Sequence, residues 1–307
     1  MAVPFSRPLR LGTRGSPLAL AQARLAADAL RSAHGWAEEA IELVPITTSG
    51  DRIQDRPLAE LGGKALWTKE LDKCLADGRT DLSVHSMKDV ETIRPAMFTV
   101  AAMLSRADTR DRLIGADGLD TLGDGARVGT SSPRRTAQLL ARRPDLDVSP
   151  IRGNVQTRLA RLERGEFEAT LLAAAGLERV GLGHIGTPMD DMLPAPSQGA
   201  IGLEIITGNS EIAALVAAVD DRPTSLAVGA ERAFLAALGG DCRSAVAAQA
   251  QCHGDRIRLR AEILASDGSE VRSGETEFAI GDEGPAEALA RELLAVASPQ
   301  LRAMFAG

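Results

Sequence analysis

A short motif occurs twice in this chain and limits its possible folds more than any other feature. The motif, Ser-Pro-x-x-x-Ala-Gln, begins at Ser16 and again at Ser132, 116 positions later. Each copy follows a strand-like run and opens an amphipathic helical pattern, and serine followed by proline is a typical helix start. An alanine-rich chain can repeat such a motif by chance, but we interpret the pair as two similar α/β domains. Each domain would point a helix N-terminus at an anion.

Strand-like and helix-like segments alternate through the first two thirds of the chain. The apolar patterns predict strands at residues 41–48, 81–86, 147–151 and 168–176, and helices at residues 65–78, 133–143 and 154–166. In the last of these helices Val155, Leu159 and Leu162 share one face. The alternation predicts mainly parallel sheets with helices on both faces, which bind ligands at the carboxyl ends of their strands.

The pattern changes in the last ~85 residues, where apolar and polar residues alternate with period two. This alternation predicts three strands at residues 244–252, 256–265 and 270–280, followed by a helix at residues 285–297. Short turns separate the strands, so we expect an antiparallel sheet covered by helices. The C-terminal part is therefore interpreted as a separate α+β domain.

The composition is that of a globular protein: 307 residues, 44% hydrophobic and 25% charged, enough for two or three domains. The N-terminal stretch has no apolar signal-peptide core, and no apolar run approaches the roughly 20 residues that span a bilayer. We therefore expect a cytoplasmic protein with reduced thiols and no membrane partner. Because the four histidines are scattered and there is no CxxC or HExxH motif, we expect no metal site.

Arginines gather in the middle of an otherwise acidic chain. The net charge is −7, yet residues 127–164 contain nine arginines against three acidic residues. Such a cluster is either a solvated basic face or a binding surface for a polyanion. The overall acidity, the 3% aromatic content and the lack of tyrosine disfavour nucleic acid as the partner. The cluster instead indicates a small molecule rich in carboxylates or phosphates.

The three cysteines differ in their surroundings. Cys74 has helical spacing with neighbouring leucines, and Cys252 continues a strand alternation, so both are expected to be buried. Cys242 lies in the loop LGGDCRSA, just before the first C-terminal strand. A loop thiol beside Arg243 is a candidate nucleophile or attachment site, although Asp241 opposes thiolate formation. The pattern leaves open whether Cys242 is functional.

The stretch VHSMKDV ends a buried strand with polar side chains. Ser86, Lys88 and Asp89 follow the apolar residues, at the end of a parallel strand where ligands are met. Lys88 is one of only four lysines beside 31 arginines. The alternative is a surface Lys–Asp pair, which contributes less than ~1 kcal/mol.

Several motifs together resemble one family. HSMKD, GTSSPRR, IRGNVQTRL, LPAPSQGAIGLE and LGGDC, in this order and spacing, are similar to those of the porphobilinogen deaminase (hydroxymethylbilane synthase) family. The resemblance implies a transferase that joins four porphobilinogen molecules head to tail, with loss of ammonia, to give hydroxymethylbilane. It implies a dipyrromethane cofactor bound through a thioether to Cys242. It also implies a monomer that passes its product to a downstream enzyme of tetrapyrrole biosynthesis.

The resemblance also implies the domain organisation. Two domains like periplasmic binding proteins, with mainly parallel sheets, would flank a cleft, and an α+β domain with a three-stranded antiparallel sheet would carry the cysteine. The implied boundaries are residues 1–104 and 198–218 for domain 1, 108–194 for domain 2, and 221–307 for domain 3.

Porphobilinogen carries an acetate and a propionate, so the growing chain gains two negative charges per unit, and arginine binds carboxylates through its planar fork. The resemblance implies Asp89 as the catalytic group, which stabilises positive charge on the pyrrole and helps to move protons. The implied cofactor-binding residues, besides Cys242, are Lys88, Ser131, Ser132, Arg134, Arg135 and Gln198. The implied substrate-binding residues are Arg14, Ser16, Arg152, Arg158 and Arg179. Lys64 and Trp67 match a loop over the cleft.

Four positions depart from the family pattern. Trp67 replaces a phenylalanine, Pro133 a leucine and Glu91 a proline, and Asp241 precedes the cysteine. A second interpretation is a binding protein of the same two-lobed build that holds an anion without catalysis. The Lys88–Asp89 pair and the cysteine loop favour the enzyme.

Overall fold

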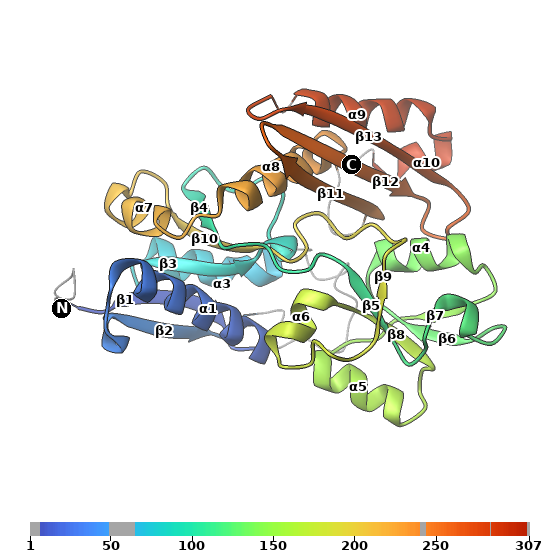
Figure 1. The fold of residues 1–307 in the computed structure, drawn as a ribbon, viewed down its shortest axis with the longest axis horizontal. Coiled ribbons are helices and arrows are strands. Elements are labelled where there is room, and N and C mark those ends of the chain that lie inside the picture. Colours follow the sequence, from blue (N-terminus) through green and yellow to red (C-terminus); the bar gives the residue numbers. More distant parts are fainter. Residues whose placement is uncertain (1–6, 49–64, 240–243, 283, 306–307) are drawn as a thin grey trace. The chain divides into compact units, whose positions relative to one another are not determined.

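The computed structural model describes residues 7–48, 65–239, 244–282 and 284–305 (Figure 1). The chain divides into two compact units. The first comprises Met1–Ala107 and Gly199–Ser225, and the second comprises Asp108–Gln198 and Leu226–Gly307. The second unit holds both the β5–β9 sheet and the C-terminal sheet, and the three-domain boundaries stay a prediction.

The first unit is built on a five-stranded sheet with the order β2-β1-β3-β10-β4. The strands are β1 (Leu9–Arg14), β2 (Ile41–Ile46), β3 (Leu82–Ser86), β4 (Phe98–Met103) and β10 (Ile201–Ile206). β1 is parallel to β2 and β3, whereas β10 is antiparallel to both of its neighbours. The helices of this unit are α1 (Pro17–His34), α3 (Ala65–Ala76) and α7 (Ser210–Ala217), and a 3-10 turn covers Met87–Asp89. Apolar residues of α1, the sheet and α7 share one core.

The second unit contains another five-stranded sheet, with the order β7-β6-β8-β5-β9. The strands are β5 (Asp111–Ile114), β6 (Arg127–Gly129), β7 (Asp147–Ser149), β8 (Ala169–Ala173) and β9 (Thr187–Met189). The helices are α4 (Pro133–Arg142), α5 (Val155–Glu163) and α6 (Ala174–Arg179). β6 is parallel to β7 and β8, and β5 is antiparallel to β8 and β9.

The two sheets correspond strand by strand. The first sheet contains β1, then α1, which starts at Ser-Pro, then β2 and β3, and antiparallel β10 pairs with β3. The second sheet contains β6, then α4, which also starts at Ser-Pro, then β7 and β8, and antiparallel β5 pairs with β8. Ser16 and Ser132 are the N-caps of α1 and α4, and each side chain accepts a hydrogen bond from a backbone N–H in the first turn. The repeated motif therefore marks a repeated α/β unit, as the sequence predicts.

Two details of these sheets differ from expectation. The fourth strand of each sheet runs antiparallel, so the sheets are mixed beyond their parallel core. The predicted strand at 168–176 is too long, because β8 ends at Ala173 and α6 begins at Ala174. Alanine has the highest intrinsic helix preference, which favours the helix in this alanine run.

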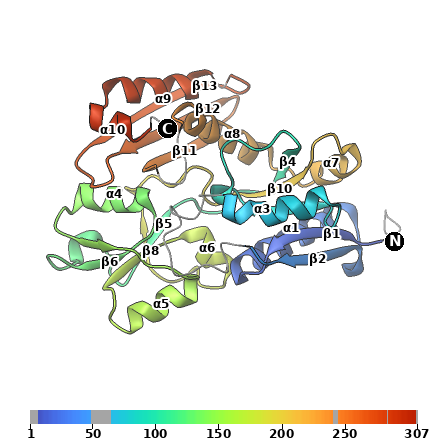
Figure 2. The same ribbon diagram turned by 180° about the vertical axis from the view of Figure 1, so that it is seen from behind.

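The rest of the second unit is an antiparallel sheet packed against helices (Figure 2). The strands β11 (Val246–His253), β12 (Arg256–Leu264) and β13 (Val271–Ala279) pair in sequence order, as predicted. Along β12 buried Ile257, Leu259, Ala261 and Ile263 alternate with polar residues, so one face of the sheet forms the core. The helices α8 (Arg222–Ala237), α9 (Gly284–Val296) and α10 (Pro299–Ala303) supply the rest of that core.

No helix among the described residues combines the length and the apolar character that crossing a membrane requires.

Candidate functional site

A small cavity opens in the first unit where the parallel strands β1 and β3 end. Arg14 is the last residue of β1, Ser86 is the last residue of β3, and Asp89 lies on the 3-10 turn that follows. The complete lining is Arg14, Ala19, Gln22, Thr68, Val84, His85, Ser86, Asp89 and Val90. The cavity volume is about 30 Å³. That is enough for one or two water molecules, and so for a polar group of a ligand rather than for a whole ring.

Asp89 stands out among the charged residues of this cavity. Among the described residues no donor is hydrogen-bonded or ion-paired to its carboxylate, which is half-buried. The neighbouring Ser86 hydroxyl is held by Gln22, whose Nε2 donates at 3.4 Å. The structure thus brings Arg14, Ser86 and Asp89 together around one cavity and leaves a carboxylate available for a ligand cation or N–H donor. Lys88 lies beside them on the same turn and is half-buried.

The helix starts carry the predicted serines. Ser16 Oγ accepts from the backbone N–H of Ala19 at 3.3 Å, and Ser132 Oγ accepts from that of Arg135 at 3.4 Å. Ser131 donates its proton to the carbonyl of Ile151 at 2.7 Å, which links the ends of β6 and β7. The Ser131 hydroxyl therefore contributes acceptor capacity to a ligand. Both helices begin with proline and use one first-turn N–H for the serine cap, which leaves few backbone N–H groups for an anion.

Arg134 and Arg135 lie in the first turn of α4, where the sequence predicts them to face an anion. The anion that they contact is Asp111, a residue that the sequence analysis does not single out. Arg134 Nη2 donates to Asp111 Oδ2 at 2.7 Å, and Arg135 donates to both carboxylate oxygens. All three side chains are buried. Burial opposes the charge on Asp111, but the two guanidinium groups outweigh it and hold its pKa far below the usual range.

Gln198 belongs to the same buried centre. Its Nε2 donates to Asp111 Oδ1 at 2.9 Å and to the carbonyl of Thr109 at 2.7 Å. The preceding Ser197 has φ +65°, a left-handed conformation that L residues with a side chain rarely adopt. Its backbone N–H donates to the buried carboxylate of Glu231 at 2.6 Å, which holds it in place. Contacts with other protein groups therefore fix the positions of Arg134, Arg135, Ser197 and Gln198.

Three other predicted arginines follow the carboxyl ends of β7 and β8. Arg152 comes just after β7, Arg158 lies on α5 and Arg179 ends α6. Burial lowers the pKa of Arg158 to about 10, and the charge of Arg135 adds to this effect. Burial likewise lowers the pKa of Arg179 to about 10, partly offset by Glu178. Among the described residues no carboxylate pairs with Arg158, whose Nε donates to the carbonyl of Gly153 at 3.0 Å.

A half-buried cation without a carboxylate partner loses part of its hydration, and an anionic ligand offsets that cost. The surroundings of Arg158 therefore fit a molecule that carries carboxylates. Arginine is also the side chain whose geometry suits two-point binding of a carboxylate.

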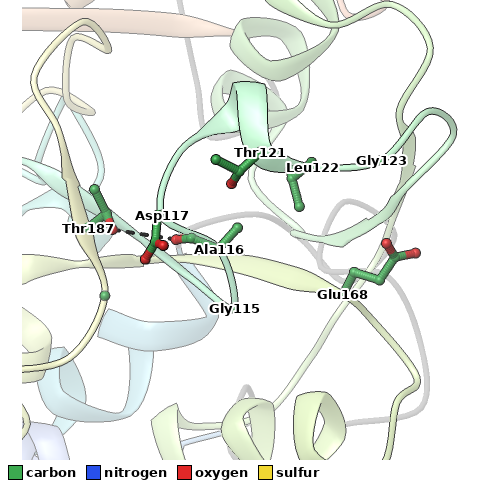
Figure 3. Close-up of a pocket in the computed structure, with 9 residues that line it drawn as sticks. Gly115, Ala116, Asp117, Thr121, Leu122, Gly123, Glu168 and Thr187 are labelled. Atoms are coloured by element: carbon green, nitrogen blue, oxygen red, sulfur yellow. Dashed lines mark hydrogen bonds between the residues drawn. The ribbon is translucent and has the colours of Figure 1, made fainter.

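A larger hollow in the second unit has a different character (Figure 3). Its volume is about 720 Å³, and its polar side chains include Asp117, Thr121, Glu168 and Thr187. Thr187 Oγ1 donates to the carbonyl of Ala116 at 3.4 Å. Glu168 immediately precedes β8, so this hollow lies at the amino end of β8, whereas the helix starts follow the carboxyl ends of the parallel strands. None of the predicted site residues lines it, and its two carboxylates disfavour an anion.

Some predicted site residues lie outside the described part of the chain. They are Cys242 and Lys64, together with the side chain of Trp67. The other two cysteines are described. Cys74 is buried, as predicted, but Cys252 is only partly buried, which corrects the expectation, because it lies near the end of β11. Among the described residues no group of three or more histidine, cysteine or acidic side chains is arranged to hold a metal ion.

Asp111 and Gln22 are the contributors that the sequence analysis misses. Asp111 opens β5, which is mostly buried, and an acidic residue at the start of a buried strand is a signal for a buried partner. Gln22 is the last residue of the first Ser-Pro-x-x-x-Ala-Gln motif. Its counterpart Gln138 is also buried and accepts from Arg134 at 2.8 Å. The repeat could therefore have identified both glutamines.

Comparisons with known proteins agree with this chemistry. Residues 9–214 match the family described as porphobilinogen deaminase, dipyromethane cofactor binding domain, and residues 225–296 match porphobilinogen deaminase, C-terminal domain. The porphobilinogen deaminase of Sphingopyxis alaskensis is 55% identical over 314 positions, which cover 100% of this chain and 99% of that protein. The porphobilinogen deaminase of Paracoccus denitrificans is 50% identical over 273 positions, 87% of each chain.

Among solved structures, the periplasmic VFT2 domain of Bordetella pertussis BvgS is 15% identical with a TM-score of 0.37. That alignment covers 74% of this chain and 91% of the other. The fold assignment therefore rests on the sheet topology described above. The family matches, in contrast, cover most of the chain in the order cofactor-binding part, then C-terminal part. On these grounds the chain belongs to the porphobilinogen deaminase family.

Proposed function

We propose that Asp89 is the charge-stabilising catalytic group of this porphobilinogen deaminase. The family's reaction joins four porphobilinogen molecules head to tail, releases ammonia at each addition and gives hydroxymethylbilane for tetrapyrrole biosynthesis. The observation that carries the assignment is the half-buried Asp89 carboxylate, which lines a cavity and has no hydrogen-bond partner among the described residues. A half-buried carboxylate without a protein donor can bind a cationic group, and the reaction supplies one.

The bond changes explain why a carboxylate is useful. The C–N bond of the substrate's protonated aminomethyl group breaks, ammonia leaves with the bonding electron pair, and the positive charge passes from the ammonium group to the pyrrole. The free α-carbon of another pyrrole then forms the new C–C bond and loses its proton. A carboxylate near the pyrrole N–H stabilises this positive charge, and removal of such a group typically lowers the rate by about 10²–10³-fold.

The arginines and helix starts of the second unit fit the cofactor part of the family. When bound, the dipyrromethane supplies the pyrrole carbon at which chain growth begins, and we assign its attachment to Cys242. The residues proposed to hold its carboxylates are Lys88, Ser131, Ser132, Arg134, Arg135 and Gln198. Arg14, Ser16, Arg152, Arg158 and Arg179 are proposed to bind substrate carboxylates. The half-buried guanidinium of Arg158 supports this division, because among the described residues no carboxylate pairs with it and burial lowers its pKa to about 10.

Arg134 and Arg135 have a second role in this proposal. Their buried contacts with Asp111 fix the first turn of α4, and with it the backbone N–H groups that follow Ser132. Their effect on the cofactor is therefore partly to hold the helix start in place. Gln198 supports the same centre through its bond to Asp111.

The finer biological setting is also a proposal. A thiol must be reduced before it can form a thioether, and the cytoplasm keeps thiols reduced. We therefore assign the enzyme to the cytoplasm, as a monomer that releases its linear product to a downstream enzyme. Light scattering on the purified protein measures the oligomeric state, and a stable dimer would contradict the proposed monomer.

The test of the function is an assay of the purified protein with porphobilinogen, combined with its intact mass. We expect ammonia release, formation of a linear tetrapyrrole and a covalent mass surplus equal to two pyrrole units. A protein of bare sequence mass that binds carboxylates but releases no ammonia would instead support a two-lobed binding protein.

A further inference from the structure

A hydrogen-bonded network lies directly behind the turn that carries Asp89. We infer that Glu91 and Thr68 are positioning residues that hold this turn against helix α3 and so set the place of the Asp89 carboxylate. The inference rests on the catalytic role proposed for Asp89. It concerns residues with no predicted part in catalysis, one of which, Glu91, departs from the family pattern.

The central contact joins α3 to the segment after the turn. Thr68, in the first turn of α3, donates from Oγ1 to Glu91 Oε1 at 2.8 Å. The other carboxylate oxygen of Glu91 accepts from Arg94 Nη1 at 2.7 Å. Thr68 is 1% exposed and lines the same cavity as Asp89. The Thr68–Glu91 hydrogen bond therefore links α3, which lines one side of the cavity, to the segment that follows the Asp89 turn.

Arg94 connects Glu91 to the sheet. Its Nε donates to Glu204 Oε1 on β10 at 2.8 Å, and its Nη2 donates to Asp72 Oδ1 on α3 at 2.6 Å. Glu204 in turn contacts the Nε2 of His85 on β3 at 3.1 Å. The chain is thus fixed at His85, four residues before Asp89, and again at Glu91, two residues after it.

The short distance along the chain between these two anchors makes the turn sensitive to either. Met87 and Val90, on the two sides of Lys88 and Asp89, are each 1% exposed and add apolar anchors. A displacement of the backbone at Glu91 should therefore also displace Asp89, because only one residue separates them. A misplacement of about 1 Å at a reacting group can lower the rate about 10²-fold.

Charge balance alone does not require Glu91. Arg94 is already paired with Glu204 and Asp72, two carboxylates that are more buried than Glu91. The contribution that only Glu91 makes is the link to Thr68 and hence to the first turn of α3. This separation identifies the Thr68–Glu91 bond as a positioning contact.

The test is Thr68→Val, which removes the hydroxyl but keeps the side-chain volume. We expect kcat to fall by about 10–100-fold with KM within about twofold, because substrate binding is not altered. The intact mass should keep the full cofactor surplus, and Thr68→Ser should restore kcat. Thr99→Val is the matched control on an exposed position of β4 and should behave as wild type. Wild-type kcat in Thr68→Val would overturn the inference.

Glu91→Ala and Glu91→Gln provide a second measurement if valine at Thr68 perturbs folding. Glutamine keeps an oxygen that can accept from Thr68, so it should retain several times more kcat than alanine. Equal losses in both variants would assign Glu91 to charge balance and contradict positioning.

A double-mutant cycle with Asp89→Asn separates this inference from the proposed function. If Thr68 acts through Asp89, Thr68→Val should have no further effect on kcat in the Asp89→Asn background. Full activity of Asp89→Asn by itself would remove the catalytic proposal. An inactive Asp89→Asn combined with independent, multiplying effects of the two changes would leave the catalytic proposal intact and overturn only the positioning role.

Discussion

Arg135 binds Asp111 in a two-point fashion: Nε donates to Oδ2 at 3.1 Å and Nη2 donates to Oδ1 at 2.7 Å. Arg134 shares Oδ2 at 2.7 Å, so one buried carboxylate contacts two buried cations. The two arginines belong to the helix start, and Asp111 opens the antiparallel strand of the same sheet. The contact therefore fixes the orientation of α4 on its sheet, and with it the predicted anion-binding turn.

Removal of this charge should destabilise the second unit strongly. Asp111→Asn keeps the size of the side chain but leaves two buried guanidinium groups without a counter-ion. Breaking a buried ion pair in this way costs about 3–5 kcal/mol in the free energy of unfolding. Urea unfolding measures the effect, and the exposed Asp190→Asn, paired only at the surface with Arg110, is the control. An unfolding midpoint equal to that of Asp190→Asn would contradict the structural role.

Replacement of Arg158 should lower activity without lowering stability, in contrast to replacement of Asp111. Burial lowers its pKa to about 10, and among the described residues no carboxylate offsets the cost. Arg158→Leu should therefore leave the urea midpoint unchanged or higher, while kcat/KM for porphobilinogen falls by about 10-fold or more, the value of a charge-assisted hydrogen bond. Arg164→Leu, which removes an exposed pair with Glu166, is the control. A destabilised Arg158→Leu with normal kcat/KM would assign this arginine to the fold.

Glu204 makes the free energy of unfolding of the first unit depend on pH. Burial opposes its ionisation, but His85 and Arg94 outweigh burial and lower its pKa from 4.5 to about 2. Because the folded-state pKa lies below the unfolded value, this stabilisation is fully present above pH 4.5 and is lost as the pH falls toward 2. The loss is on the order of 3 kcal/mol.

Urea midpoints between pH 6 and pH 3 test this dependence. Glu204→Gln should be less stable at pH 6 and should lose less stability on acidification than wild type. Glu211→Gln, at an exposed position of α7, should keep the wild-type slope. Asp72 and Glu91 also pair with Arg94 and are present in both proteins. Burial and the charge of Glu204 raise the pKa of Asp72, so the change of slope in Glu204→Gln includes the response of Asp72.

The sequence predicts the local elements of this fold well, because each depends on residues close together in the chain. Ser16 and Ser132 cap their helices as the Ser-Pro signal indicates, since a cap needs only the first helical turn. The period of two in the C-terminal part predicts β11–β13, because each strand buries one face of the sheet. The apolar face of α5, with Val155, Leu159 and Leu162, also packs as expected.

Long-range pairing is what local patterns do not contain. β10 enters the first sheet between β3 and β4 from more than 90 residues away, and only the family resemblance indicates its return. Asp111 lies 23 and 24 positions from its two arginines, so its choice of partner depends on tertiary packing. The sequence predicts that Arg134 and Arg135 face an anion, but the strand that supplies Asp111 is not predicted. For the same reason Glu91 is visible only as a departure from a pattern, and not as a partner of Thr68.

The proposed thioether makes Cys242 the only cysteine needed for the cofactor. Cys242→Ser should give a folded, inactive protein without the mass surplus, because a serine hydroxyl is a much weaker nucleophile than a thiolate. Cys74→Ser and Cys252→Ser are the matched controls, and both should keep the surplus. Cys74→Ser should also lower stability, because Cys74 is buried in the first unit. Intact mass spectrometry decides the matter, and a full surplus on Cys242→Ser would move the attachment elsewhere.

Asp89 allows the contribution of charge to be separated from that of shape. Asp89→Asn keeps the size and one acceptor oxygen but removes the negative charge that stabilises the cationic pyrrole. Asp89→Glu keeps the charge and moves it by one methylene group. If charge stabilisation dominates, kcat should fall by at least about 10²–10³-fold in Asp89→Asn, whereas Asp89→Glu should keep measurable turnover. Single-turnover kinetics on cofactor-loaded protein, with mass spectrometry to count the rings added, measures both.

The structure also indicates that these two variants should fold normally. The Asp89 carboxylate is half-buried and has no hydrogen-bond partner among the described residues, so its replacement leaves no protein donor unsatisfied. A loss of activity can therefore be assigned to the reaction, provided that the urea midpoint is unchanged. In Asp89→Glu the longer side chain enters a cavity of only about 30 Å³, so addition of successive rings should slow and partly elongated species should accumulate. Equal activity of Asp89→Asn and wild type would remove Asp89 from the mechanism and leave carboxylate binding by the arginines as the chemistry that the site supports.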